Sequence, residues 1–191
     1  METTKTDQPV LKTIDLVYIG IFAVLIAICS WISIPAAVPF TLQTFGIFVT
    51  ARILGGKRTV FAVLVYLLMG CIGLPVFSGF GAGAGVLMGS TGGYLIGFLF
   101  SALVIWLFEK VLGCGKAAVL FSMVIGLVVC YAFGTIWFLA VYAKTKGPIS
   151  VMTALGWCVF PFIIPDLIKI ALAFVVGERV KKTGDWLLTI P

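Results

Sequence analysis

Two oppositely charged residues, Asp166 and Lys169, lie three positions apart inside the otherwise uncharged apolar segment Phe160–Val176. A charged side chain in the hydrocarbon of a bilayer costs roughly 2.5–3.5 kcal/mol on insertion scales, so such residues mark functional sites by default. A spacing of i, i+3 puts both on one face of a helix. We predict that this face binds a polar ligand; the alternative is a structural ion pair that fixes helix packing.

A second candidate site is Ser90-Thr91-Gly92-Gly93-Tyr94, which opens another long apolar segment. Ser90 or Thr91 is a suitable N-cap for a helix beginning there. The unpaired backbone N–H groups at a helix N-terminus favour anionic groups. We therefore predict that Gly92 and Gly93 present N–H groups to an anionic part of a ligand. An ordinary cap, with Gly89, Gly93 and Gly97 used for close helix contact, fits the pattern equally well.

Gln43 begins an apolar segment directly after a proline-rich stretch. Its amide is predicted to hydrogen-bond the ligand, with capping or loop anchoring as the alternative. Tyr94, Trp137, Tyr142 and Trp157 are expected at the outer interface of a membrane, where an aromatic belt is the usual explanation. We predict that one or two of the rings of Tyr94, Trp137 and Tyr142 stack on a ring of the ligand.

The elements that must position these residues are membrane helices. The 191-residue chain is 62% hydrophobic and 10% charged, whereas soluble proteins carry about 25% charged residues. This composition predicts an all-α integral membrane protein with one domain, residues 1–191. Six apolar spans fit, the second and third of them shorter than the roughly 20 residues of a full crossing: Ile14–Trp31, Thr41–Leu54, Thr59–Cys71, Thr91–Leu112, Ala117–Tyr142 and Phe160–Val180.

Charge predicts the orientation of these spans. With six spans, ten basic residues fall at one side of the membrane, and only Lys144 and Lys146 fall at the other. The side rich in Lys and Arg is the cytoplasmic one, so both termini, including segment 1–12, are predicted to be cytoplasmic. The outer connections 33–42 and 73–90 are apolar and uncharged. Irregular backbone at membrane depth must be buried in protein, so we expect both to fold over a site as lids.

Several functions are disfavoured by residues that are missing. Histidine is absent, which removes the commonest general base and metal ligand. The five cysteines are scattered without a CxxC pair, and no phosphate-binding P-loop sequence occurs. We expect no enzymatic activity, no metal and no cofactor. The net charge of +6 is explained by membrane orientation, so no nucleic-acid partner is expected.

The chain resembles the BioY family, the biotin-specific S components of energy-coupling-factor vitamin transporters. The resemblance rests on the segments 38–43, 90–98 and 165–169, and a small-xxx-small pattern at Ala23 and Ala27 is similar to the family's contact motif for the coupling protein. The resemblance implies biotin capture from outside a prokaryotic cell. It also implies partnership with a transmembrane coupling subunit and two cytoplasmic ATPase subunits, which alone would use ATP.

Biotin chemistry suits the candidate residues. Asp166 can accept a ureido N–H bond and Lys169 can donate to the ureido carbonyl, and such charge-assisted bonds are strong. The carboxylate of biotin is then predicted near Gly92 and Gly93, with Gln43 nearby; the reverse arrangement, with the carboxylate on Lys169, stays open. Alternative functions are an S component for thiamine or riboflavin, a stand-alone proton-coupled carrier, and a membrane enzyme or assembly factor.

Overall fold

A computed structural model describes residues 12–36 and 38–184 of the chain. The elements of this part are helices and one two-stranded antiparallel hairpin, joined by loops. The strands are β1 (Ser33–Ile34) and β2 (Phe40–Thr41), and η1 (Ser78–Phe80) is a single 3-10 turn. The helices are α1 (Thr13–Trp31), α2 (Gln43–Leu54), α3 (Gly56–Cys71), α4 (Ala84–Met88), α5 (Gly92–Leu112), α6 (Lys116–Thr145), α7 (Val151–Cys158) and α8 (Phe160–Gly184).

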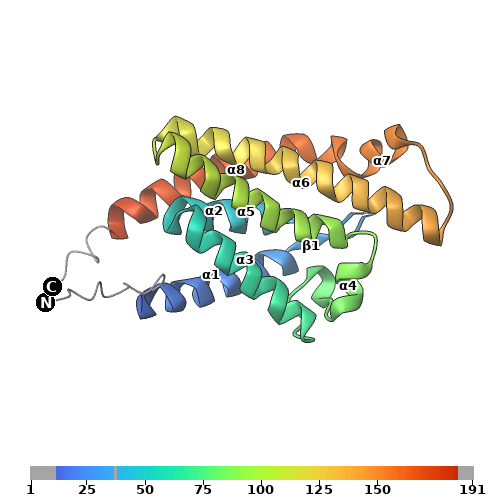
Figure 1. Ribbon diagram of the computed structural model, residues 1–191, viewed down its shortest axis with the longest axis horizontal. Helices are drawn as coiled ribbons and strands as arrows, with labels where there is room; N and C mark the ends of the chain where they lie inside the picture. The colour runs from blue at the N-terminus through green and yellow to red at the C-terminus, as the bar shows by residue number, and fades with distance from the viewer. Residues whose placement is uncertain (1–11, 37, 185–191) are drawn as a thin grey trace, which may run out of the picture.

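Length and hydrophobicity explain the long helices. Within the described residues, four helical stretches are long and apolar enough to cross a membrane: α1, α5, α6 and the α7–α8 stretch Val151–Thr183. In hydrocarbon every backbone polar group must be satisfied internally, and an apolar run of this length achieves that as a helix. Successive long elements run in opposite directions, so the start of α1 and the end of α8 lie at the same end of the bundle (Figure 1).

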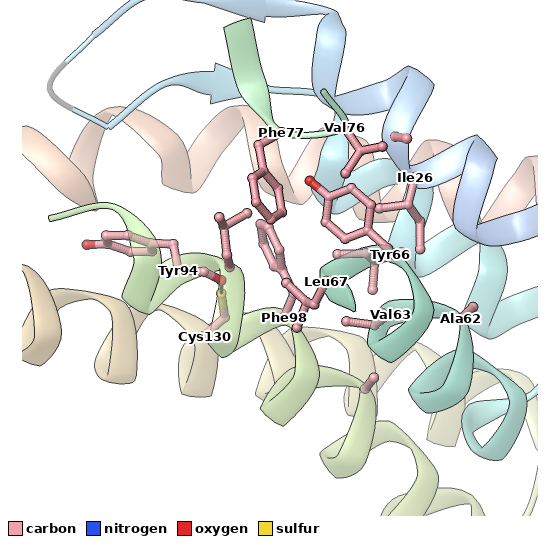
Figure 2. Packing of buried hydrophobic residues seen from close by; sticks show 14 of the residues in the cluster. Ile26, Ala62, Val63, Tyr66, Leu67, Val76, Phe77, Tyr94, Phe98 and Cys130 are labelled. Atoms are coloured by element: carbon pink, nitrogen blue, oxygen red, sulfur yellow. Dashed lines mark hydrogen bonds between the residues drawn. The ribbon is translucent and has the colours of Figure 1, made fainter. Parts of the chain in front are cut away.

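The short helix α2 is the centre of the molecule. Ten of its twelve residues are buried, and it packs against α1, α3, α5 and above all α8. Because α2 is enclosed by longer helices, its polar residues are held inside protein rather than in lipid. Figure 2 shows part of the apolar core next to it, where Tyr66 and Leu67 of α3 meet Phe98 of α5 and Phe77 from the outer connection.

Glycines bring α5 and α6 into close contact, as the small-residue pattern predicts. A Cβ atom at Gly93 would collide with the Trp137 side chain, and one at Gly97 would lie 3.0 Å from Cys130 Sγ. Gly89 precedes the helix, and its carbonyl accepts a hydrogen bond from Trp137 Nε1 at 3.0 Å. The two helices therefore pack tightly because these positions carry no side chain.

The two connections predicted to lie on the outer side gather with α7 at the end of the bundle opposite the start of α1 (Figure 1). We call the first the outer hairpin, formed by β1 and β2, and the second the glycine-rich segment, residues 73–90, which contains η1 and α4. The hairpin pairs Ser33 with Thr41 and Ile34 with Phe40. Trp31 Nε1 donates to the Pro75 carbonyl at 2.8 Å, so the end of α1 is tied to the glycine-rich segment.

Ion pairs close the other end of the bundle. Arg52 of α2 pairs with Glu178 of α8, and Arg58 of α3 pairs with Asp15 of α1 at 2.7 Å. Glu109 of α5 accepts a hydrogen bond from the backbone N–H of Gly56 at 2.5 Å. These contacts join five helices where the basic residues cluster.

Candidate functional site

A cavity lies where the central helix meets the outer connections. It contains about 730 Å³ of space free of protein atoms, a figure that includes open solvent at its mouth. The outer hairpin region, the glycine-rich segment and helices α2, α5, α6, α7 and α8 all contribute to its wall. The lining residues are Val38, Pro39, Thr41, Gln43, Thr44, Phe77, Ser78, Val86, Thr91, Tyr94, Leu95, Phe98, Cys130, Tyr131, Cys158, Phe162, Asp166 and Lys169.

Asp166 is held by three hydrogen-bond donors from three helices. Its Oδ1 accepts from Thr44 Oγ1 of α2 at 2.9 Å and from Lys169 Nζ at 2.8 Å. Its Oδ2 accepts from the Tyr131 hydroxyl of α6 at 2.5 Å. The residue is only 2% exposed, so these bonds replace the water that an ionised carboxylate would otherwise need. They fix the carboxylate where α2, α6 and α8 converge.

Lys169 lies one helical turn further along α8 and is also buried. Its Nζ donates to Asp166 Oδ1 and, at 2.7 Å, to the backbone carbonyl of Thr41 in β2. The ammonium also lies 4.0 Å from the centre of the Phe40 ring, a favourable cation–π geometry. The lysine therefore connects the ion pair on α8 directly to both residues of strand β2.

The pair retains unused hydrogen-bonding capacity beside the cavity. An ammonium has three N–H donors and a carboxylate accepts about four hydrogen bonds. In the described part of the chain, Lys169 makes two hydrogen bonds and Asp166 accepts three. One donor and one acceptor thus remain for a ligand, and the two charges cancel. This arrangement suits a neutral polar group that offers both an N–H and a carbonyl.

The rest of the wall is mostly apolar. Phe77, Leu95, Phe98 and Phe162 provide carbon surface around the ion pair, and the Phe162 ring packs 5.6 Å from that of Phe40. A small apolar ring system with one polar end would bury its carbon atoms here. Convergent polar groups in an otherwise apolar pocket are the usual form of a small-molecule site.

Three further predicted residues line the cavity. Gln43 does so with its amide already engaged: Oε1 accepts from Thr41 Oγ1 at 2.9 Å, and Nε2 donates to the Tyr66 hydroxyl at 2.6 Å. Thr91 occupies the N-cap position of α5, but its side chain makes no capping hydrogen bond. Tyr94 lies in the wall with its hydroxyl 3.0 Å from Thr135 Oγ1.

The other predicted ligand contacts lie outside the lining residues. The N–H of Gly92 bonds the Gly89 carbonyl at 3.1 Å, and Gly93 packs on Trp137. Ser90 does not line the cavity either. The Tyr142 ring stacks on Phe138 at 5.4 Å and meets Trp157 edge-on at 6.1 Å. In this arrangement Gly92, Gly93, Trp137 and Tyr142 serve packing, and their predicted contact with a ligand is not supported by the geometry.

The partner contact through Ala23 and Ala27 stays a prediction, and within this chain both residues face inward. Their exposed fractions are 0% and 3%, and both belong to the internal apolar cluster. The small side chains therefore let α1 approach its neighbours within the chain, which is the other recognised use of such a pattern. The outward face of α1 carries larger apolar residues instead, among them Val24 and Ile28.

Sequence reasoning missed the residues that hold the ion pair. Thr44 directly follows Gln43, so the polar run at the start of α2 was a signal that could have identified it. Tyr131 is a single tyrosine in the middle of an apolar helix, and its sequence context gives no comparable signal. The Thr41 carbonyl is a backbone group and could only be found from the tertiary structure.

Comparison with known proteins finds transporters of similar sequence and fold. The model of the BioY family matches residues 2–185. The biotin transporter BioY of Thermotoga maritima is 43% identical over 169 residues, covering 88% of this chain and 96% of that protein. A probable biotin transporter BioY of Pyrococcus horikoshii is 34% identical over 172 residues, covering 90% and 98%. A crystal structure of the S-component for biotin from an ECF-type ABC transporter is 30% identical and superposes with a TM-score of 0.77, covering 88% of this chain and 90% of that one.

Proposed function

This chain belongs to the BioY family, and on that premise we propose that it is the biotin-binding S component of an energy-coupling-factor importer. It is a multi-pass membrane protein of the prokaryotic plasma membrane and a transport protein rather than an enzyme. Its task is to capture biotin in the cavity at the outer end of the bundle and hold it for uptake.

We propose six membrane crossings, by α1, α2, α3, α5, α6 and α8, with both termini in the cytoplasm. The start of α1 and the end of α8 lie at the same end of the bundle, which supports an even number of crossings (Figure 1). The basic residues at the Arg52–Glu178 and Arg58–Asp15 end support a cytoplasmic location of that end. The cavity then opens toward the outside, where the vitamin is available.

The observation that carries the biotin assignment is the buried Asp166–Lys169 pair in the wall of an apolar cavity. The ureido ring of biotin offers N–H donors and a carbonyl acceptor side by side. The remaining acceptor capacity of Asp166 suits one N–H, and the remaining N–H of Lys169 suits the carbonyl. Bonds of this kind to ionised groups are stronger than neutral ones, and the phenylalanine-rich wall suits the sulfur-containing ring.

The charge balance favours the ureido ring at the pair over the carboxylate of biotin. The Lys169 ammonium already bonds Asp166 at 2.8 Å, so a carboxylate placed on Lys169 would bring a second negative charge close to the first. Like charges in a buried site are unfavourable. We therefore propose that the carboxylate points away from the pair, toward the hydroxyl groups of Thr91 and Ser78 in the wall.

ATP-driven uptake requires partners, because the sequence carries no P-loop. We propose a transmembrane coupling subunit and two cytoplasmic ATPase subunits as these partners. The structural similarity to an S-component of an ECF-type transporter supports a transporter module as the partner.

Isothermal titration of the purified protein with biotin, thiamine and riboflavin tests the assignment. We expect the protein to bind biotin tightly and to bind neither thiamine nor riboflavin. We also expect mass spectrometry to identify biotin as the small molecule that co-purifies with the protein. Preferred binding of another vitamin would replace biotin as the substrate. Uptake by the protein alone that follows a pH gradient would instead support a proton-coupled carrier.

Biotin methyl ester tests the orientation of the ligand, because it keeps the ureido ring and lacks the charged carboxylate. With the ureido ring at the pair, Asp166→Asn should weaken biotin and the ester by the same factor. If the carboxylate sat on Lys169, Lys169→Ala would weaken biotin strongly and the ester hardly at all, which would reverse the proposed orientation.

A further inference from the structure

We propose that Tyr66, a residue outside the cavity wall, is a positioning residue that joins the two outer connections and thereby sets how long biotin stays bound. The inference rests on the proposed function, since it assumes that biotin occupies the cavity. It concerns a different question, namely what keeps the cavity closed once the ligand is inside.

Tyr66 is held in place by its burial on α3. Its exposed fraction is 0%, and its ring lies beside that of Phe77 and below Val76 (Figure 2). The hydroxyl is the polar end of an otherwise apolar environment. A buried hydroxyl needs hydrogen-bond partners, and this one has two, the side chains of Gln43 and of Ser30 at the end of α1.

The hydroxyl of Tyr66 connects to the outer hairpin through Gln43. Gln43 Nε2 donates to Tyr66 Oη at 2.6 Å, and Gln43 Oε1 accepts from Thr41 Oγ1 at 2.9 Å. The backbone N–H of Gln43 donates back to Thr41 Oγ1 at 3.2 Å. Thr41 belongs to β2, and its carbonyl accepts from Lys169. A chain of hydrogen bonds thus runs from Tyr66 to the hairpin residue that also bonds the ion pair.

The ring of Tyr66 connects to the glycine-rich segment through Phe77. The two rings meet edge to face at a centroid distance of 5.6 Å and an angle of 84°, a favourable aromatic geometry. Phe77 lines the cavity and is 1% exposed. The end of its ring packs against Gly70 of α3, where a Cβ atom would collide with it. The next residue back, Val76, accepts a hydrogen bond from Ser30 at 2.5 Å.

Tyr66 therefore connects to both segments that close the cavity. Its hydroxyl is linked to the outer hairpin through Gln43, and its ring contacts Phe77 of the glycine-rich segment. Opening the hairpin requires the Gln43 amide to leave the Tyr66 hydroxyl, and opening the glycine-rich segment requires Phe77 to leave the ring. Loss of the hydroxyl weakens the first connection and leaves a buried amide donor of Gln43 without its partner. Without the hydroxyl the two segments close the biotin-bound cavity less firmly, so we expect the dissociation rate of biotin to rise.

Tyr66→Phe tests the proposal because it removes the hydroxyl and keeps the ring. The protein is loaded with radiolabelled biotin, and release is followed after adding an excess of unlabelled biotin. We expect release about tenfold faster, with association changed less than about threefold and the number of binding sites per protein unchanged. Tyr18→Phe, the same chemical change near the start of α1, is the matched control and should release biotin at the wild-type rate.

A double-mutant cycle with Gln43→Met shows whether the hydroxyl acts through Gln43. If it does, adding Tyr66→Phe to Gln43→Met causes little further acceleration of release. Equal and independent effects of the two changes would overturn the proposed connection. A wild-type release rate in Tyr66→Phe, or a loss of binding sites without a change in release rate, would overturn the positioning role.

Hydrogen exchange on the unchanged protein provides a test that does not depend on folding of a variant. Amides at residues 40–42 and 74–83 should open at a common rate and gain protection together when biotin is added. Separate rates for the two segments would contradict the proposal. Failure of the wild-type protein to bind biotin would refute the proposed function instead, so the two failures are distinguishable.

Discussion

The Asp166–Lys169 pair allows a perturbation that separates its structural role from its role in binding. Each single change, Asp166→Asn or Lys169→Met, leaves the opposite charge buried without its partner. The double change Asp166→Asn/Lys169→Met removes both charges and nearly preserves side-chain volume. Stability should then depend on whether the charges are balanced, whereas biotin binding should depend on whether they are present.

The expected magnitudes follow from burial and from the bonds made. The exposed fractions of the two residues are 2% and 6%, and breaking a buried ion pair by removing one partner costs about 3–5 kcal/mol. Each single variant should therefore melt on the order of 10 °C lower. Replacing both charges is often nearly neutral. Thr44 and Tyr131 can still bond the side-chain amide that the double variant carries in place of the carboxylate, so this variant should recover most of the loss.

Biotin affinity should behave differently. A hydrogen bond to a charged group is worth about 1.5–3 kcal/mol, which corresponds to a factor of about ten to one hundred in affinity. We expect each single variant to bind biotin weaker by about this factor, and the double variant to remain at least as weak as either. Recovered stability with unrecovered affinity is the result that identifies a ligand-binding pair.

Thermal melting followed by fluorescence measures the stability of each variant, and isothermal titration measures biotin affinity. Glu178→Gln is the control, because it leaves Arg52 buried and unpaired at the far end of the bundle. It should lower the melting temperature without changing biotin affinity. A double variant that binds biotin like the wild-type protein would refute the argument, since the pair would then serve only the fold.

Two further predictions concern the support of the site and the packing behind it. Tyr131→Phe removes the hydroxyl that bonds Asp166 at 2.5 Å and should weaken biotin by about tenfold in titrations; unchanged affinity would mean that Asp166 is held well enough by its other contacts. Gly93→Leu forces a side chain into Trp137 and should lower stability by about 1–3 kcal/mol in thermal melts. Gly20→Ala, where a Cβ atom has nothing within 4 Å, should leave stability equal or slightly higher, and a loss as large as that of Gly93→Leu would contradict the packing argument.

The helices were predictable because their cause is local. Each predicted span overlaps an observed helix, as for Phe160–Val180 against α8 and Thr41–Leu54 against α2. A run of apolar residues in a bilayer satisfies its backbone within the segment, so neighbours are not needed to specify it. The ion pair was predictable for a similar reason. Two charges within an apolar segment are unfavourable wherever that segment packs, so the sequence of the segment is enough to identify them. The number of crossings remains a prediction from the apolar spans, and the cytoplasmic side remains a prediction from charge.

The roles of individual residues depended on contacts between segments. Ala23 and Ala27 fit a partner surface and an internal contact equally well as a pattern, and the rotation of α1 in the bundle decides for the interior. Gln43 was predicted to meet a ligand, yet Tyr66 from another helix occupies its amide. Gly93 was predicted to offer an N–H group, but α6 packs on it.

The sequence by itself determined that the chain forms apolar helices and that Asp166 and Lys169 are its exceptional residues. Only the tertiary structure decided that Thr44, Tyr131 and the Thr41 carbonyl surround that pair, and that an apolar cavity lies beside it. The physical reason is that the desolvation of a charge is a property of the residue and its segment, whereas a hydrogen bond between α2, α6 and α8 exists only after those helices have packed.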